Sequence, residues 1–306
     1  MARKTTRKTD PKMPDEILPP KSDIVFKLLF GDERELGLLT ALLKAVLDLP
    51  EDEYDEVSIA DPNLLREFEN DKLAILDVKV KTKSGRVINV EIQITDTDEM
   101  KERIIYHLSK MITEQIGMGD DYDKIKQVVA IVVADFNLIE DSEPYHHHYF
   151  FYDKKNDSKF TDLMEAHTLE LRKLPPESDQ TKLYEWLRFL RTERREELEM
   201  LPRNNPDINK AVGRLLELSS DEKARMLYEV REKARRDEAA RIKTAKRLGM
   251  EEGEAKGIAK GIAKGIAEGK AEERISIAKK LLGLSLPVAD IAKATGLPLE
   301  EIKKLL

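Results

Sequence analysis

Two short β-strands joined by a tight turn constrain this chain more than any other feature of its sequence. The segments 73–81 and 87–94 alternate apolar and polar residues and are rich in Val and Ile, as half-buried strands are. The intervening Lys83-Ser84-Gly85 predicts a three-residue hairpin loop, because Gly85 can adopt the left-handed conformation that such a loop requires. A chain with this hairpin must contain a β-sheet.

The length of the loop decides which residues face each other across the hairpin. A three-residue loop places Asp77 directly opposite Glu91, so that both point to the same face of the sheet. Gln93 shares this face, two residues farther along. A two-residue turn would instead place Ile92 opposite Asp77. We prefer the three-residue loop because it gathers the polar residues on one side.

Two facing carboxylates repel each other, and a divalent cation is the usual reason for such a pair. Mg²⁺ takes one or two carboxylates together with water and phosphate oxygens, so Asp77 and Glu91 are candidate metal ligands. The alternative is a solvated strand face, which Lys79 and Lys81 would also suit. The pattern alone leaves both interpretations open.

A resemblance to a known family favours the metal site. The segments that carry it occur in order along the chain and are Ser22–Gly31, Asp71–Lys79, Ile88–Gln93 and Lys101–Tyr106. Together they resemble the Rpn family, the recombination-promoting nucleases and PD-(D/E)XK-type transposases, over residues 20–175. The resemblance implies an α/β fold with a restriction-endonuclease-like mixed-sheet core. It also implies metal-dependent DNA cleavage, with Mg²⁺ (or Mn²⁺) as cofactor and DNA as partner.

The resemblance assigns roles to individual residues. Asp77 and Glu91 match the metal-binding acids, and Gln93 stands where the signature has a Lys. Asp23 matches the acid of the N-terminal helix, which completes the set of candidate catalytic residues. Three cations in these segments are candidates for phosphate contact: Lys27, Lys79 and Arg103.

Composition limits the classes of function that need to be considered. The 306 residues suffice for one substantial domain and a smaller one or an extension. The absence of Cys excludes thiol catalysis and zinc–thiolate sites. A net charge of −7 argues against a tight non-specific nucleic-acid binder but is compatible with a local basic cleft. No apolar run is long enough for a membrane span or a secretory signal, so we expect a cytoplasmic protein.

The nuclease-like domain is predicted to span residues 21–176, after a disordered basic arm at 1–20. Besides the hairpin, helices are predicted at 22–31, 33–47 and 98–117, and strands at 57–60, 127–134, 145–152 and 167–174. The helix at 98–117 has an apolar face that includes Ile104 and Ile105. The run 127–134 is apolar throughout, which is typical of a central strand covered on both faces.

Three consecutive histidines, His146 to His148, raise the question of a metal site. In a strand only His146 and His148 share a face, and no acidic or Cys partner has the spacing of a metal site. We therefore predict a structural or surface role for all three.

The C-terminal extension is predicted to be helical in three parts. Residues 177–247 form a charged helical segment in which catalysis is not expected. Residues 248–273 carry Gly at every fourth position, which favours a semi-flexible spacer, with a self-association stripe as the alternative. In residues 274–306 the spacing of Ala292, Gly296 and Ile302 resembles a small helix-turn-helix module, for which DNA contact and protein docking both stay open.

Two functions follow from these observations. The first is a metal-dependent DNA endonuclease, which the resemblance links to recombination and transposition. The second is a nuclease-fold protein with weak or lost catalysis that binds DNA or protein through its helical tail. In either case the glycine repeat and the C-terminal helices could support a homo-oligomer, and no contact with a membrane is expected.

Overall fold

The computed structural model describes residues 16–60 and 77–306, apart from the side chain of Arg34. The chain forms two compact units, the first ending at Arg235 and the second running from Arg236 to Leu306. None of the helices in the described part of the chain is both long and apolar enough to cross a membrane.

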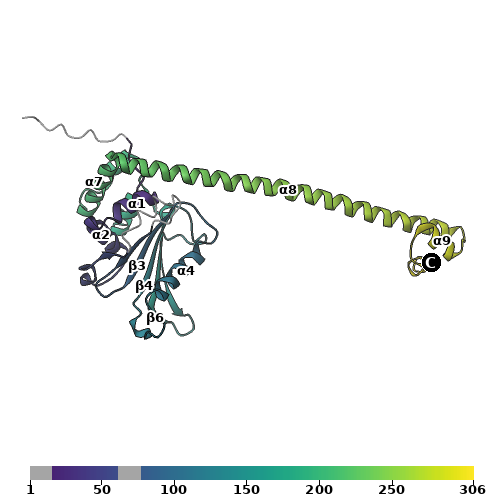
Figure 1. Ribbon diagram of the computed structural model, residues 1–306, viewed down its shortest axis with the longest axis horizontal. Coiled ribbons are helices and arrows are strands. Elements are labelled where there is room, and N and C mark those ends of the chain that lie inside the picture. Colours follow the sequence, from purple (N-terminus) through teal and green to yellow (C-terminus); the bar gives the residue numbers. More distant parts are fainter. Residues whose placement is uncertain (1–15, 61–76) are drawn as a thin grey trace, which may run out of the picture. The chain divides into compact units, whose positions relative to one another are not determined.

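A six-stranded mixed sheet forms the centre of the first unit, as predicted (Figure 1). Its order is β1-β2-β3-β4-β6-β5, with β3, β4 and β6 parallel to one another and the other pairs antiparallel. The strands are β1 Ser58–Ile59, β2 Val78–Lys81, β3 Val87–Gln93, β4 Val128–Ala134, β5 His146–Asp153 and β6 Ser158–Glu170. Every residue of β4 is buried, which confirms the prediction of a central strand covered on both faces.

The β2–β3 hairpin has the predicted register. Val78 pairs with Val90, and the Gly85 N–H donates to the Thr82 carbonyl oxygen over 2.9 Å. Gly85 has a φ of +86°, which an L side chain rarely adopts, so glycine is needed in this three-residue loop. Continuing the register by one residue places Asp77 opposite Glu91. The predicted strand residues 73–76 lie outside the described part of the chain.

Helices cover both faces of the sheet (Figure 1). α4 (Met100–Thr113) packs on one face through Met100, Ile104, Leu108 and Met111. α1 (Asp23–Phe30) and α2 (Leu36–Val46) pack on the other. Ile105 was predicted on the apolar face of α4 but is 55% exposed, because consecutive helical residues are about 100° apart and only Ile104 points to the sheet.

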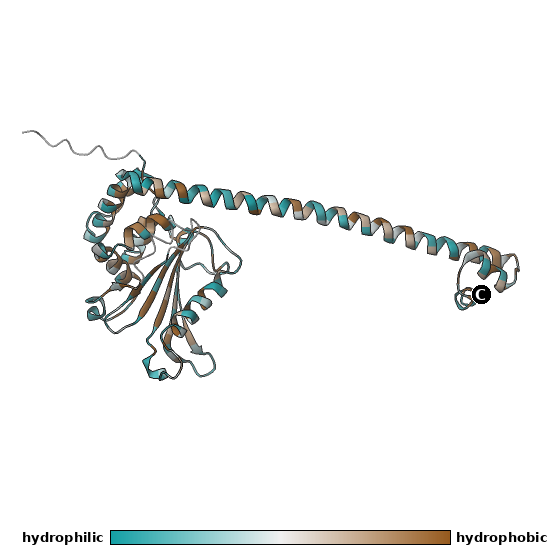
Figure 2. Ribbon diagram, viewed as in Figure 1, coloured by the Kyte–Doolittle hydropathy of each residue, from teal (hydrophilic) through white to brown (hydrophobic). Residues whose placement is uncertain are grey.

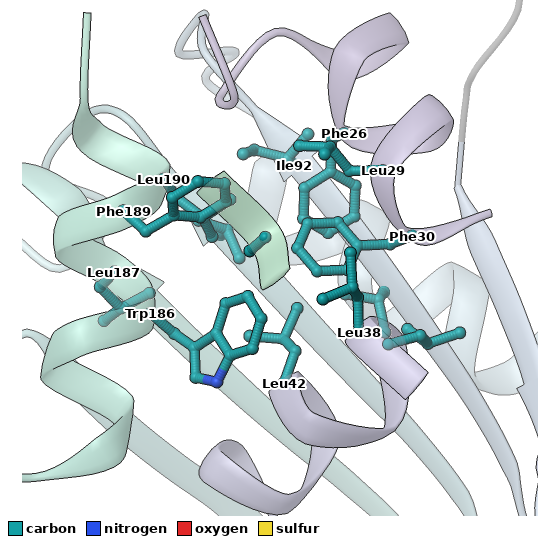
Figure 3. Packing of buried hydrophobic residues seen from close by; sticks show 14 of the residues in the cluster. Phe26, Leu29, Phe30, Leu38, Leu42, Ile92, Trp186, Leu187, Phe189 and Leu190 are labelled. Atoms are coloured by element: carbon teal, nitrogen blue, oxygen red, sulfur yellow. The ribbon is translucent and has the colours of Figure 1, made fainter. Parts of the chain in front are cut away.

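Three further helices complete the first core: α5 (Lys182–Arg191), α6 (Arg195–Glu199) and α7 (Pro206–Ser220). Trp186 of α5 meets Phe30 of α1 edge-on, with ring centroids 5.8 Å apart, close to Leu42 of α2 (Figure 3). The predicted division at residue 176 therefore does not separate two cores, since the apolar stripe of α5 is buried against α1 and α2.

Other elements also differ from the predicted ones. Ile17 and Leu18, which fall in the predicted disordered arm, are buried, and the Leu18 N–H donates to Ser219 Oγ over 3.0 Å. β6 begins at Ser158, well before the predicted start at His167, because its first half pairs with β5 in an exposed hairpin. Short 3₁₀ helices occur at Glu33–Glu35, Glu51–Tyr54, Tyr122–Lys124 and Leu171–Lys173.

α8 (Glu222–Gly283) contains the boundary between the two units and continues as a helix through the glycine repeat. The ribbon of the sheet is mostly hydrophobic, whereas α8 is largely hydrophilic (Figure 2). A Cβ atom built on any of the six repeat glycines, Gly249 to Gly269, would meet nothing within 4 Å. Ion pairs one turn apart, such as Arg247–Glu251 at 2.7 Å, each add a few tenths of a kcal/mol to helix stability.

The second unit has a small core of its own beyond the repeat. α9 (Val288–Thr295) and α10 (Leu299–Lys303) pack with the end of α8 around Ala278, Ile291 and Ile302. Gly296 ends α9 with a φ of +71°, as the predicted helix-turn-helix-like turn requires. The predicted DNA contact, protein docking and self-association of this unit stay predictions.

Candidate active site

The polar face of the β2–β3 hairpin forms the floor of the candidate site. Asn89, Glu91 and Gln93 alternate along β3 and therefore point to the face that α4 covers. Glu91 is buried, with 4% of its surface exposed. Asp77, immediately before β2, accepts a hydrogen bond at Oδ2 from Asn89 Nδ2 over 3.1 Å. The structure thus brings together three of the four predicted catalytic residues, Asp77, Glu91 and Gln93.

α4 supplies two cationic or titratable side chains to the same place. Arg103 forms an ion pair with Glu91 through Nη2 and Oε1. His107, one turn farther along the helix, has its Nδ1 3.8 Å from Asp77 Oδ2. Ligand atoms of Asp77, Glu91 and His107 all lie within 4.8 Å of one another. Sequence reasoning missed His107, although its i, i+4 spacing from Arg103 placed it on the same helix face.

Burial controls the charge of these groups. It raises the pKa of Glu91 to about 7, with a further contribution from the negative charge of Asp77, while Arg103 and Gln93 oppose the rise. Burial also raises the pKa of Asp77, against the hydrogen bond from Asn89. The pKa of His107 is lowered, again mainly by burial, so its imidazole is neutral at neutral pH. Binding of a proton or a cation to the two carboxylates is therefore strongly favoured.

Gln93, predicted to stand at the position of the signature Lys, directly contacts Glu91, a candidate metal ligand. Its Nε2 donates to Glu91 Oε1 over 2.7 Å. The amide presents only a dipole at a place where a Lys would present a full charge. Arg103 provides that positive charge from α4 instead.

Asp23, the fourth predicted catalytic residue, is not a member of the group of close ligand atoms formed by Asp77, Glu91 and His107. Its Oδ2 accepts a hydrogen bond of 2.8 Å from Arg231 Nε of α8. Its Oδ1 accepts a hydrogen bond from the main-chain N–H of the next residue over 2.7 Å.

The predicted phosphate contacts have different surroundings. Lys27 is buried and donates from Nζ to the main-chain oxygen of Asp77 over 2.8 Å, so it holds the backbone of a candidate ligand. Lys79 is partly exposed, and its Nζ lies 3.2 Å from Oε2 of Glu114 at the end of α4. Arg103 directly contacts the side chain of Glu91, a candidate metal ligand.

The side chains of this site fit a divalent cation. Asp77 Oδ1 is buried and has no hydrogen-bond partner among the described residues. Such an atom costs about 1–3 kcal/mol unless something else satisfies it. Carboxylate oxygens are the ligands that Mg²⁺ and Mn²⁺ prefer, and the neutral nitrogen of His107 extends the set toward transition metals.

Comparison with known proteins agrees with this geometry. A family described as PD-(D/E)XK nuclease family transposase matches residues 20–245. The match covers α1, the hairpin, α4 and the helices α5 to α7, and it ends within α8. No curated protein and no solved structure matches the chain significantly. Because the family matches well over half of the 306 residues, the chain belongs to the PD-(D/E)XK nuclease family transposases.

Proposed function

We propose that this protein is a metal-dependent endonuclease that hydrolyses phosphodiester bonds in DNA. The observation that carries the proposal is the pair of buried carboxylates, Asp77 and Glu91, facing each other across one hairpin with an unpartnered oxygen on Asp77. Membership of a nuclease family supports DNA as the substrate and a role in recombination or transposition. PD-(D/E)XK nucleases use divalent metals, for which this pair supplies ligands.

In this proposal Asp77 and Glu91 hold Mg²⁺ or Mn²⁺, and His107 supplies a third ligand atom. A bound divalent metal lowers the pKa of its water and neutralises charge that develops on the phosphate. Gln93 keeps the Glu91 carboxylate in one orientation through its hydrogen bond. Asn89 does the same for Asp77.

The neighbouring cations have two separate tasks. Arg103 balances the charge of Glu91, and its guanidinium would be a donor for a phosphate oxygen of the substrate. Lys27 positions the main chain at Asp77 from within α1. Asp23 supports this arrangement indirectly, because its ion pair with Arg231 holds the first turn of α1.

The test is nicking of supercoiled plasmid by the full chain with Mg²⁺ or Mn²⁺. We expect cleavage by the wild type and its loss in Asp77→Ala and in Glu91→Gln, because each removes one metal ligand. Glu102→Gln, an exposed carboxylate of α4, is the matched control and should cleave like the wild type. Circular dichroism verifies that each variant is folded.

One observation favours the second candidate function, a binding module without catalysis. Arg103 already neutralises Glu91, and Gln93 adds no charge, so the pair can exist without a metal. Absence of cleavage by well-folded wild type, on duplex and on single-stranded DNA, would favour this function. Binding would then reside in the C-terminal helices.

A further inference from the structure

A second group of ligand-type side chains lies at the other end of the sheet, on β5 and β6. His148 of the edge strand β5 pairs directly with His167 of β6, and Glu165 lies two residues before His167. The three therefore point to one face. Ligand atoms of all three lie within 4.8 Å of one another. The prediction that the histidine run lacks an acidic partner is thus wrong, because the partner comes from the neighbouring strand.

This group is separate from the candidate active site. On β4, Val132 pairs with Glu91, and the preceding residue Ile131 pairs with His167. Consecutive strand residues point to opposite faces, so Glu91 and His167 are on opposite sides of the sheet. Whatever His148, Glu165 and His167 bind is therefore not bound at the nuclease site.

The spacing between His167 and Glu165 suits a tetrahedral transition metal. His167 Nε2 lies 3.4 Å from Glu165 Oε1, and His148 Nε2 contacts the same oxygen. Ligands on a tetrahedral Zn²⁺ with bonds of about 2.0–2.1 Å are about 3.4 Å apart. Two imidazoles and one carboxylate are a donor set that Zn²⁺ accepts, whereas Mg²⁺ prefers oxygen ligands alone.

The deepest of the three side chains has an atom without a partner. The His167 side chain is 4% exposed, and its Nε2 has no hydrogen-bond partner among the described residues. Its Nδ1 is 2.9 Å from His146 Nε2. When Nδ1 donates to His146, the lone pair of Nε2 faces a carboxylate oxygen, and these two electron-rich atoms repel unless a cation lies between them.

A hydrogen bond from outside the group fixes the orientation of the Glu165 carboxylate. Gln127 Nε2 donates to Glu165 Oε2 over 2.7 Å, and Gln127 Oε1 in turn accepts a hydrogen bond from Arg86. This arrangement leaves Oε1 of Glu165 for the histidines. Protein metal sites commonly fix their carboxylate and imidazole ligands by such outer hydrogen bonds.

We propose that His148, Glu165 and His167 form a Zn²⁺ site that joins the edge strand β5 to β6. His148 is 42% exposed, which gives the metal a path from solvent and leaves room for water as the fourth ligand. The β5–β6 register shifts immediately after Phe150, so the site lies where regular pairing is interrupted. A clamp at this position would keep the end of the exposed hairpin in register.

The experiment is a titration of untagged, chelator-treated full chain with Zn²⁺, followed by calorimetry. It is carried out in an Asp77→Asn background, since the group of Asp77, Glu91 and His107 also has a nitrogen donor. We expect one Zn²⁺ per chain. His148→Gln and His167→Gln should each weaken binding by more than the roughly 10–100-fold that loss of an outer hydrogen-bond partner causes, and Gln127→Ala should fall within that range.

The matched control is His147→Gln, because His147 is on the same strand but points to the opposite face, where it contacts Ser142. It should bind Zn²⁺ like the parent. Co²⁺ in place of Zn²⁺ should give the intense visible absorption of a tetrahedral site, and this absorption should be lost in His148→Gln.

Two results would overturn the proposal. One is the absence of Zn²⁺ binding by the Asp77→Asn chain, which would mean that hydrogen bonds among His148, Glu165 and His167 satisfy these side chains without a metal. The other is binding of equal strength in His148→Gln, an exposed change that should not impair folding. Neither result bears on DNA cleavage, because the site lies on the other face.

Discussion

The two faces of the central sheet carry ionisable clusters that respond to burial in opposite ways. On the α4 face, burial raises the pKa of Glu91 to about 7. On the other face, burial lowers the pKa of His146 to about 4. Both shifts follow from one cause, since burial disfavours whichever form is charged. The acid cluster therefore favours uptake of a proton or a cation, even with Arg103 beside Glu91, whereas the buried histidines present neutral nitrogen lone pairs. The type of donor, more than the fold, decides which ion each face suits.

The largest effect that sharpens this comparison is the pH dependence of stability. Between about pH 4.5 and pH 7 Glu91 is ionised in the unfolded chain but protonated in the folded one. The folded state then binds more protons, so the free energy of unfolding falls as pH rises through this window, by an amount on the order of 3 kcal/mol. In Glu91→Gln this loss should be absent. Urea unfolding of both proteins at several pH values measures it, and parallel profiles would contradict the account.

Removal of the Arg103 side chain should lower the free energy of unfolding by somewhat less than the pH-dependent loss caused by Glu91. Arg103→Ala leaves the buried Glu91 carboxylate without its ion-pair partner, which should destabilise the fold by about 2 kcal/mol at pH 8. At pH 5 Glu91 is protonated and the loss should be much smaller. The control is Lys101→Ala, an exposed residue of the same helix, with a change below about 0.5 kcal/mol. Equal losses at both pH values would show that Arg103 acts through packing alone.

The independence of the two faces gives a third prediction. Because Asp77 and His167 are on opposite sides of the sheet, the destabilisations caused by Asp77→Asn and His167→Gln should add within about 0.5 kcal/mol in the double variant. The measurement is urea unfolding of the two single variants and the double variant. A larger interaction energy would mean that the two clusters are coupled through β4.

The smallest expected effect concerns Gln93. Gln93→Lys brings an ammonium group to Glu91 Oε1, where it should lower the pKa of that carboxyl by about one unit. The pH dependence of stability and of cleavage should move to lower pH by the same amount. Gln93→Met, which has similar length and no charge, should not cause this movement.

The two clusters also differ in how far the sequence predicts them. The loop at Gly85 fixes the hairpin register, so Asp77 and Glu91 can be placed opposite each other from the chain alone. His148 and Glu165 come together only through the β5–β6 pairing, and β6 began earlier than the pattern predicted. The contacts of Arg103 and His107 with the two carboxylates depend on how α4 is rotated about its axis. Apolar periodicity predicts this rotation only approximately.

The mixed sheet and its helices were predictable because apolar periodicity reports burial directly. How far the first hydrophobic core extends along the chain could not be predicted from the sequence. The stripe of α5 at Trp186 has the same pattern whether it packs on the sheet domain or on a separate module, and only the structure places it beside Phe30. Likewise, glycine propensity alone favours a spacer at 248–273, whereas the structure is helical there.

Thermal unfolding of wild type and Asp77→Ala at increasing Mg²⁺ concentration tests the central claim most directly. If Asp77 and Glu91 hold a divalent cation, the wild type should gain stability with the logarithm of Mg²⁺ concentration, by about 2.7 kcal/mol at 100 times the Kd. Asp77→Ala should show no such gain. An equal gain in both proteins, or none in the wild type with either Mg²⁺ or Mn²⁺, would contradict a metal site between the two hairpin carboxylates.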